Sequence, residues 1–141
     1  MSAIRSIAAI IAGFGFMAST VMVGTIIATA LFIPGGLTAA SAGAVPASLP
    51  LGYLAANLTV SLLGAVLGGW LAARIATHAP FAHAIVLAAI VASLSIATLM
   101  SAPQGPQPAW YSVTVGAIGA LGVLLGGWLR ASAAIAPTAV T

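Results

Sequence analysis

Acidic residues, lysine and cysteine are all absent from this chain of 141 residues. Without a carboxylate, the chain has no acid–base pair, no ligand suited to a hard cation and no carboxylate proton relay. Without cysteine, it has neither a thiol nucleophile nor a thiolate metal site. A Ser–His–Asp triad is excluded because the chain has no carboxylate. We therefore expect a protein that is not an enzyme and that holds no metal through such groups.

Charge of either sign is nearly missing. The only fixed charges belong to Arg5, Arg74 and Arg130, so charged residues make up 2% of the chain and hydrophobic residues 62%. A soluble domain typically carries about a quarter charged residues. Three separated arginines also lack the density of a nucleic-acid-binding surface. The composition predicts an integral membrane protein, with the lipid bilayer as its partner and no role in nucleic-acid binding.

The apolar residues fall into runs of about 20 or more, which is the length of a membrane helix. They lack the alternation of apolar and polar residues that marks a membrane β-strand. We predict an all-α polytopic membrane protein, with one domain covering residues 1–141. The four expected spans are 6–33, 51–73, 81–100 and 110–129.

The first run is about twice as long as the 7–15-residue apolar core of a signal peptide. We therefore expect it to be retained as a span. The later spans each follow a proline, a residue that suits the first turn of a helix. These prolines are Pro50, Pro80 and Pro108.

The three arginines predict the orientation of the chain. Arg5 precedes the first span, Arg74 follows the second and Arg130 follows the fourth, so all three lie on one side. By the positive-inside rule, both termini are expected in the cytoplasm. Loop 74–80 would then be cytoplasmic, and loops 34–50 and 101–109 extracytoplasmic.

Aromatic residues near the ends of the spans are typical of membrane–water interfaces. Tyr53, Trp110 and Tyr111 are expected at the outer interface, and Trp70 and Trp128 at the inner one.

An internal repeat links the second and fourth spans. The pattern Leu-Gly-x-x-Leu-Gly-Gly-Trp-Leu at 63–71 recurs 58 residues later, at 121–129. The same offset relates Pro50 to Pro108 and Tyr53 to Tyr111. We predict two tandem helical hairpins, spans 1–2 and 3–4, related by an axis along the membrane normal.

Each copy of the repeat contains a GxxxG motif followed by another glycine. Small residues at this spacing share a helix face and allow close helix packing in membranes. An alternative is that they line a narrow path or admit a flat cofactor against the backbone. The glycines concerned are Gly64, Gly68, Gly69, Gly122, Gly126 and Gly127.

Two polar residues within the spans suggest more specific chemistry. His83, near the start of the third span, is a candidate ligand for haem iron or for a chlorophyll-type magnesium. Its alternative is an interfacial histidine bonded to a backbone carbonyl or to headgroups. Asn57 is the only amide inside a span. It would form hydrogen bonds between helices or provide a polar lining for a solute path.

Several stretches of the chain resemble small uncharacterised bacterial membrane proteins with four spans. They are Leu-Gly-Gly-Trp-Leu-Ala-Ala-Arg at 67–74, His-Ala-Pro-Phe-Ala-His-Ala at 78–84, Pro-Ala-Trp-Tyr at 108–111 and Leu-Gly-Gly-Trp-Leu-Arg at 125–130. The resemblance implies a location in the bacterial inner membrane and carries no known activity.

Three functions fit these observations. The first is a non-catalytic accessory subunit of a larger membrane complex, or a homo-oligomer, acting through helix–helix packing. The second is a small channel or transporter for a neutral or lipid-like solute. The third is a pigment- or haem-associated subunit that uses His83. The sequence identifies no particular cofactor.

Overall fold

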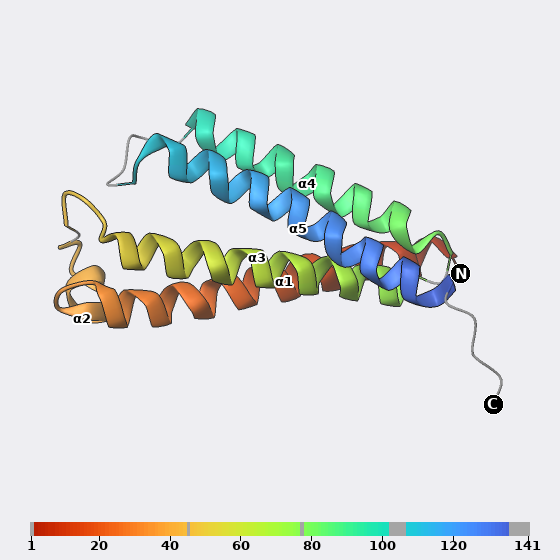
Figure 1. Cartoon of the computed structure of the whole chain (residues 1–141), viewed down its shortest axis with the longest axis horizontal. Coiled ribbons are helices and arrows are strands. Elements are labelled where there is room, and N and C mark those ends of the chain that lie inside the picture. The colour runs from red at the N-terminus through yellow and green to blue at the C-terminus, as the bar shows by residue number, and fades with distance from the viewer. Residues whose placement is uncertain (1, 45, 77, 102–106, 136–141) are drawn as a thin grey trace.

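The computed structural model describes residues 2–44, 46–76, 78–101 and 107–135. These residues form helices and the turns that connect them, with no β-strand among them (Figure 1). Four of the helices are long and apolar enough to cross a membrane. This confirms the predicted all-α membrane fold with four spans. The long helices are α1 (Ser2–Phe32), α3 (Leu51–Ile75), α4 (Pro80–Ser101) and α5 (Ala109–Ile135), and the short α2 (Gly36–Ser41) follows α1.

The observed helix ends extend the sequence-based spans. Helix α3 continues to Ile75, beyond Arg74, and α5 continues to Ile135, beyond Arg130. An arginine ends an apolar run without ending a helix, because its long side chain reaches the interface while the backbone continues. Part of the expected C-terminal tail is therefore helical, and 136–141 lie outside the described residues.

The loop between the first two spans contains the short helix α2. Gly35 and Gly36 have φ values of 77° and 54°. Glycine adopts this left-handed conformation without a steric penalty, so the chain turns directly after Pro34.

Helices α3 and α5 form the centre of the bundle. They run in the same direction, with α1 packed against α3 and α4 packed against α5 (Figure 1). Helix α4 makes smaller contacts with α3 and α1. The antiparallel neighbours α1–α3 and α4–α5 are arranged as two hairpins, and the repeated segments lie on the two central helices.

Backbones approach most closely where α3 meets α5. A Cβ atom added to Gly69 would run into the backbone carbonyl of Val123, and one added to Gly126 would run into the carbonyl of Val66. Because both obstacles are backbone atoms of a helix, rotation of a side chain cannot relieve them. The third glycine of the first copy, Gly69, and the second glycine of the other copy, Gly126, thus lie at one helix crossing.

The other glycines of the repeat also face helices of the same chain, namely α1, α3 and α4. A Cβ on Gly68 would lie 2.7 Å from the Gly13 carbonyl oxygen in α1, and one on Gly64 would lie 3.4 Å from the Met17 carbonyl oxygen. A Cβ on Gly122 would lie 2.8 Å from the Cβ of Ala65, and one on Gly127 would collide with Ala84 in α4. Each glycine of the motif is buried against a helix of this chain.

Two buried clusters follow from this packing. The first lies in the half of the bundle that contains the repeated glycines, and its members are Ala65, Ala72, Ala84, Leu87, Ala88, Val91 and Val123. The second lies near the opposite end, and its members are Ala28, Ile33, Tyr53, Leu54 and Tyr111. Small residues dominate the first cluster and aromatic rings contribute to the second.

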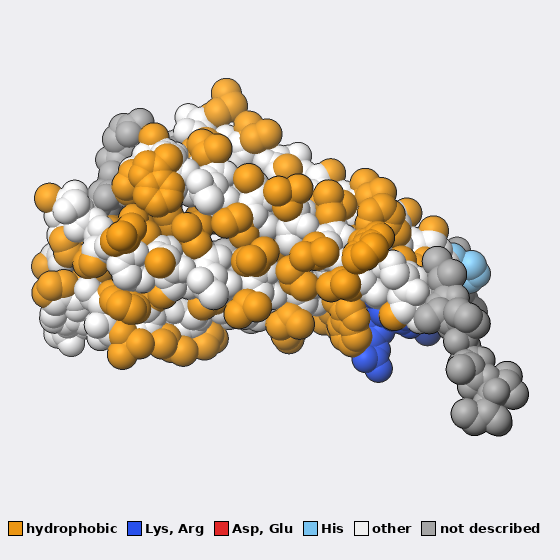
Figure 2. All heavy atoms as spheres, viewed as in Figure 1, with side chains coloured by type: hydrophobic (Ala, Val, Ile, Leu, Met, Phe, Trp, Pro, Cys, Tyr) orange, Lys and Arg blue, Asp and Glu red, His pale blue; other side chains and the backbone are white. Residues whose placement is uncertain are grey.

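The outer surface of the bundle is apolar, as contact with lipid requires (Figure 2). The arginine side chains visible in Figure 2 gather at the end where α1 begins and α5 ends. Below, we call this end the arginine end and the opposite one the uncharged end.

The helix crossing makes a direct prediction about stability. Replacing Gly126→Ala forces α3 and α5 apart, and overpacking of this kind typically costs about 1–3 kcal/mol. We expect a lower midpoint of thermal unfolding in detergent micelles. The matched control is Gly15→Ala in α1, because Gly15 has no atom within 4 Å of an added Cβ. Equal midpoints for the two variants would contradict the packing role of the motif.

Candidate functional site

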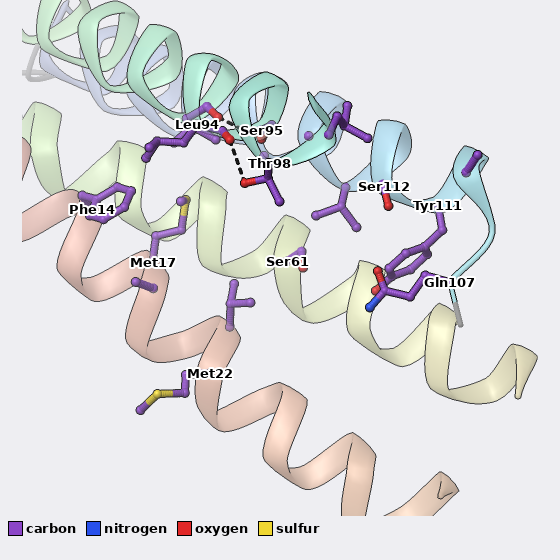
Figure 3. A pocket seen from close by; sticks show the side chains of 18 residues that line it. Phe14, Met17, Met22, Ser61, Leu94, Ser95, Thr98, Gln107, Tyr111 and Ser112 are labelled. Atoms are coloured by element: carbon purple, nitrogen blue, oxygen red, sulfur yellow. Dashed lines mark hydrogen bonds between the residues drawn. The ribbon is translucent and has the colours of Figure 1, made fainter. Parts of the chain in front are cut away.

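A groove of about 780 Å³ lies between α1 and α4, with residues of α3 and α5 completing its lining (Figure 3). Small-molecule sites commonly have volumes of about 300–1,000 Å³. One wall is provided by 14, 17, 18, 21 and 22 of α1, and the other by 91, 94, 95, 98 and 99 of α4. The groove is therefore of a size that suits a ligand.

The groove exists because α1 and α4 contact each other only near one end of the bundle. Near the arginine end, Leu87 of α4 approaches Gly13 of α1, and Ile10, Phe14 and Met17 pack against the first cluster. Towards the uncharged end, the two helices separate (Figure 1). Gly116 and Gly119 of α5 also line the groove, and a Cβ added to them would lie 2.9 Å from Ser95 Cβ and 3.0 Å from Val91 Cγ1 of α4.

The lining changes character along the groove. Phe14, Met17 and Val91 make the deep end apolar, and Gln107 and Ser112 lie near the uncharged end (Figure 3). Hydroxyl groups of Ser61, Ser95 and Thr98 lie between these limits. No charged side chain is found among the described residues of the lining.

A polar cluster next to the groove joins three helices. The Thr25 hydroxyl of α1 donates a hydrogen bond to Asn57 Oδ1 of α3, at 2.8 Å. The Asn57 side chain also lies within reach of the Tyr111 hydroxyl of α5. Tyr111 is only 4% exposed and lines the groove as well. Asn57 thus takes part in the interhelical hydrogen bonding that its position in the span suggested.

The two tyrosines expected at the outer interface are buried in the bundle. Tyr53 and Tyr111 are near the uncharged end and are 8% and 4% exposed. Their role as interface anchors stays a prediction. Asn57 supplies a polar neighbour for the Tyr111 hydroxyl, which lowers the cost of burying it.

The tryptophans lie closer to the expectation. Trp110 and Trp128 are about half exposed, near opposite ends of α5. The Trp110 ring meets Tyr111 edge to face, with centroids 5.9 Å apart. Trp70 lies under the Arg74 guanidinium, whose carbon is 5.0 Å from the ring centroid, which is within cation–π range. These positions are compatible with anchoring, which stays a prediction.

His83 lies apart from the groove, near the arginine end. Its Nδ1 is 3.1 Å from the carbonyl oxygen of Ala79, which fits donation to the backbone. That tautomer leaves Nε2 with a free lone pair. A small pocket beside the ring is also lined by Ser6 and Ile10. The geometry matches the backbone-bonded alternative for His83, and its role as a cofactor ligand stays a prediction.

Metal binding by clustered ligands has no support in the described part of the chain, where no group of three or more His, Cys, Asp or Glu side chains occurs. His78 is exposed in the loop before α4.

Sequence reasoning did not identify the groove or show that its hydroxyl groups lie together. Ser95 and Thr98 are spaced three residues apart on α4, and Gly116 and Gly119 have the same spacing on α5. This spacing places each pair on one helix face, and that signal could have been noticed. Gly13 was also missed, although it forms a small-xxx-small pair with the buried Ala9.

Comparisons with protein families, curated proteins and solved structures find no match to this chain. Functional argument therefore depends on the residues themselves.

The polar cluster yields a second prediction. Asn57→Leu removes the hydrogen bond from Thr25 and leaves the buried Tyr111 hydroxyl without its polar neighbour. We expect a loss of about 1–2 kcal/mol, measured by unfolding in micelles, since interhelical hydrogen bonds in membranes are typically worth about 1 kcal/mol each. The control is Thr59→Val, because the exposed Thr59 hydroxyl bonds only to its own helix at Ala55. A neutral Asn57→Leu variant would exclude the cluster as a source of stability.

Proposed function

We propose that this protein is a non-catalytic membrane protein that binds a neutral, lipid-like solute in the groove between α1 and α4. The proposal keeps the neutral or lipid-like solute of the second function considered above, and replaces transport of that solute by binding. The observation that carries it is the groove itself, which combines a ligand-sized volume with an apolar lining and scattered hydroxyl groups. Such a combination is typical of sites for small apolar molecules.

The accessory-subunit hypothesis loses one of its arguments. It was based on the apolarity of the chain, the lack of catalytic groups and the glycine faces of the second and fourth spans. These faces contact α1, α4 and each other within the same chain. The apolar outer surface is what lipid contact alone requires, so it does not by itself suggest a protein partner.

Neutrality of the solute is supported by the composition. A charged group at membrane depth is costly unless a partner of opposite sign or water compensates it. The chain has no acidic side chain to pair with an amine. Its arginines are outside the lining of the groove.

We further propose that the arginine end faces the cytoplasm of a bacterial cell, with the groove opening in the outer half of its inner membrane. The positive-inside rule supports this orientation. Because the chain has no native cysteine, Ser48→Cys and Ser132→Cys each introduce a single thiol at an exposed position. An impermeant maleimide applied to intact cells should label only Ser48→Cys, and labelling of only Ser132→Cys would reverse the orientation.

The binding proposal is tested by filling the groove. Ala18 is exposed and lines the groove in α1, so Ala18→Phe should reduce the affinity for a diazirine-bearing long-chain alcohol at least about tenfold, or about 1.4 kcal/mol. The measurement is photolabelling of the purified protein in nanodiscs, with excess unlabelled alcohol to define the saturable part. Ala8→Phe is the control, because Ala8 is exposed on α1 outside the groove.

Saturable labelling should map to peptides of α1, α4 and α5 that line the groove. Labelling that is non-saturable and spread over the lipid-facing surface would contradict the proposal.

A further inference from the structure

The hydroxyl groups of the groove have a specific hydrogen-bonding capacity. Ser95 Oγ donates to the Val91 carbonyl at 2.8 Å, and Thr98 Oγ1 donates to the Leu94 carbonyl at 2.9 Å (Figure 3). A hydroxyl has one hydrogen to donate and two lone pairs to accept with. Since both hydrogens are used within α4, these two side chains offer acceptors to a ligand and no donor.

An acceptor pair selects for a ligand that donates. An alcohol or an amide N–H can bond to Ser95 and Thr98, whereas an ester, which only accepts, cannot. Gln107, Ser61 and Ser112 also line the groove and can pair with either kind of group, so the selection depends on the two α4 side chains.

The order of the lining residues sets the direction of the ligand. Deep in the groove, Phe14 and Met17 offer only apolar contact, while Thr98, Ser112 and Gln107 lie towards the uncharged end (Figure 3). A molecule with one polar end and one apolar chain would be stabilised with the chain inward, because the reverse would place its polar end among apolar side chains.

We propose that the groove takes an uncharged single-chain amphiphile whose polar end donates a hydrogen bond, as in a long-chain alcohol or monoacylglycerol. Its polar end lies beside Ser95 and Thr98, and its chain extends towards Phe14 and Met17. This inference rests on the proposed function and deepens it by naming the ligand class and its direction.

The ligand class is tested by competition against the diazirine-bearing alcohol in nanodiscs. The competitors are a long-chain alcohol, its methyl ether and the alkane of equal length. We expect the alcohol to compete about three- to tenfold better than the ether, which corresponds to the net value of one hydrogen bond. The ether has similar size and accepts without donating, so the difference isolates the donor.

Two variants separate this recognition from general stability. Ser95→Ala combined with Thr98→Val should remove the preference for the alcohol over the ether while leaving binding of the alkane in place. Thr114→Val is the matched control. The Thr114 hydroxyl also donates to the preceding turn, at 2.8 Å to the Trp110 carbonyl, but it lies outside the groove. That variant should keep the full preference.

The direction is tested with two probes that carry the diazirine near the polar end or near the end of the chain. The first should label the peptide containing Ser112, and the second the peptide containing Phe14 and Met17. Equal competition by alcohol, ether and alkane, or the reversed labelling pattern, would overturn this inference while leaving the groove as a binding site. Loss of saturable labelling with every probe would instead overturn the proposed function. Occupation of the groove by a helix of another chain, seen as cross-links between protomers that block the probes, would overturn both.

Discussion

The close contact between the α3 and α5 backbones is the constraint on which the rest of the structure depends. At Gly69 and Gly126, carbonyl groups of the opposite helix occupy the space where a Cβ would lie. In a membrane, helices gain little from hydrophobic exclusion, so van der Waals contact at small residues is a main source of their association. The two central helices are therefore held together near the arginine end.

The positions of the outer helices follow from other glycines near this contact. Helix α1 contacts α3 through Gly13 and Gly68, and α4 reaches α5 at Gly127. Both contacts lie in the half of the bundle near the arginine end. Towards the uncharged end, the interior is filled by larger residues such as Tyr53 and Tyr111. With α1 held on α3 and α4 held on α5, the two outer helices diverge, and the groove lies between them. Tight packing at one end thus produces an open site at the other.

Much of this fold could be predicted from the sequence, because membrane helices are recognised by the length and apolarity of their segments. The prolines Pro50, Pro80 and Pro108 lie at the starts of α3, α4 and α5, whereas α3 and α5 continue past Arg74 and Arg130. The glycine motif predicted close contact, but a motif alone does not say which helix it faces. The partners became clear only in three dimensions, where the motif proved to face helices of the same chain.

The candidate site was harder to predict for a physical reason. In a chain this apolar, the residues that face lipid and those that line a groove have the same composition, so no pattern distinguishes Met17 from Leu31. The burial of the tyrosines was not predicted for a related reason. Their place near the ends of helices suggested the interface, and the sequence does not show that the Asn57 side chain lies beside the buried Tyr111. Asn57 was informative because an amide within a membrane span needs a partner.

Helices α1 and α4 contact each other near the arginine end and separate towards the uncharged end, and distances between spin labels on the two helices measure this difference directly. Cysteines would replace Met22 and Leu99 on the walls of the groove, and in a second protein Ile7 and Val86 near the arginine end, both in nanodiscs. The account predicts a longer and broader distance distribution for the first pair than for the second, with the first altered by a bound long-chain alcohol. Equally short and narrow distributions at both ends would show that α1 and α4 close along their length, which would contradict the groove and the function proposed for it.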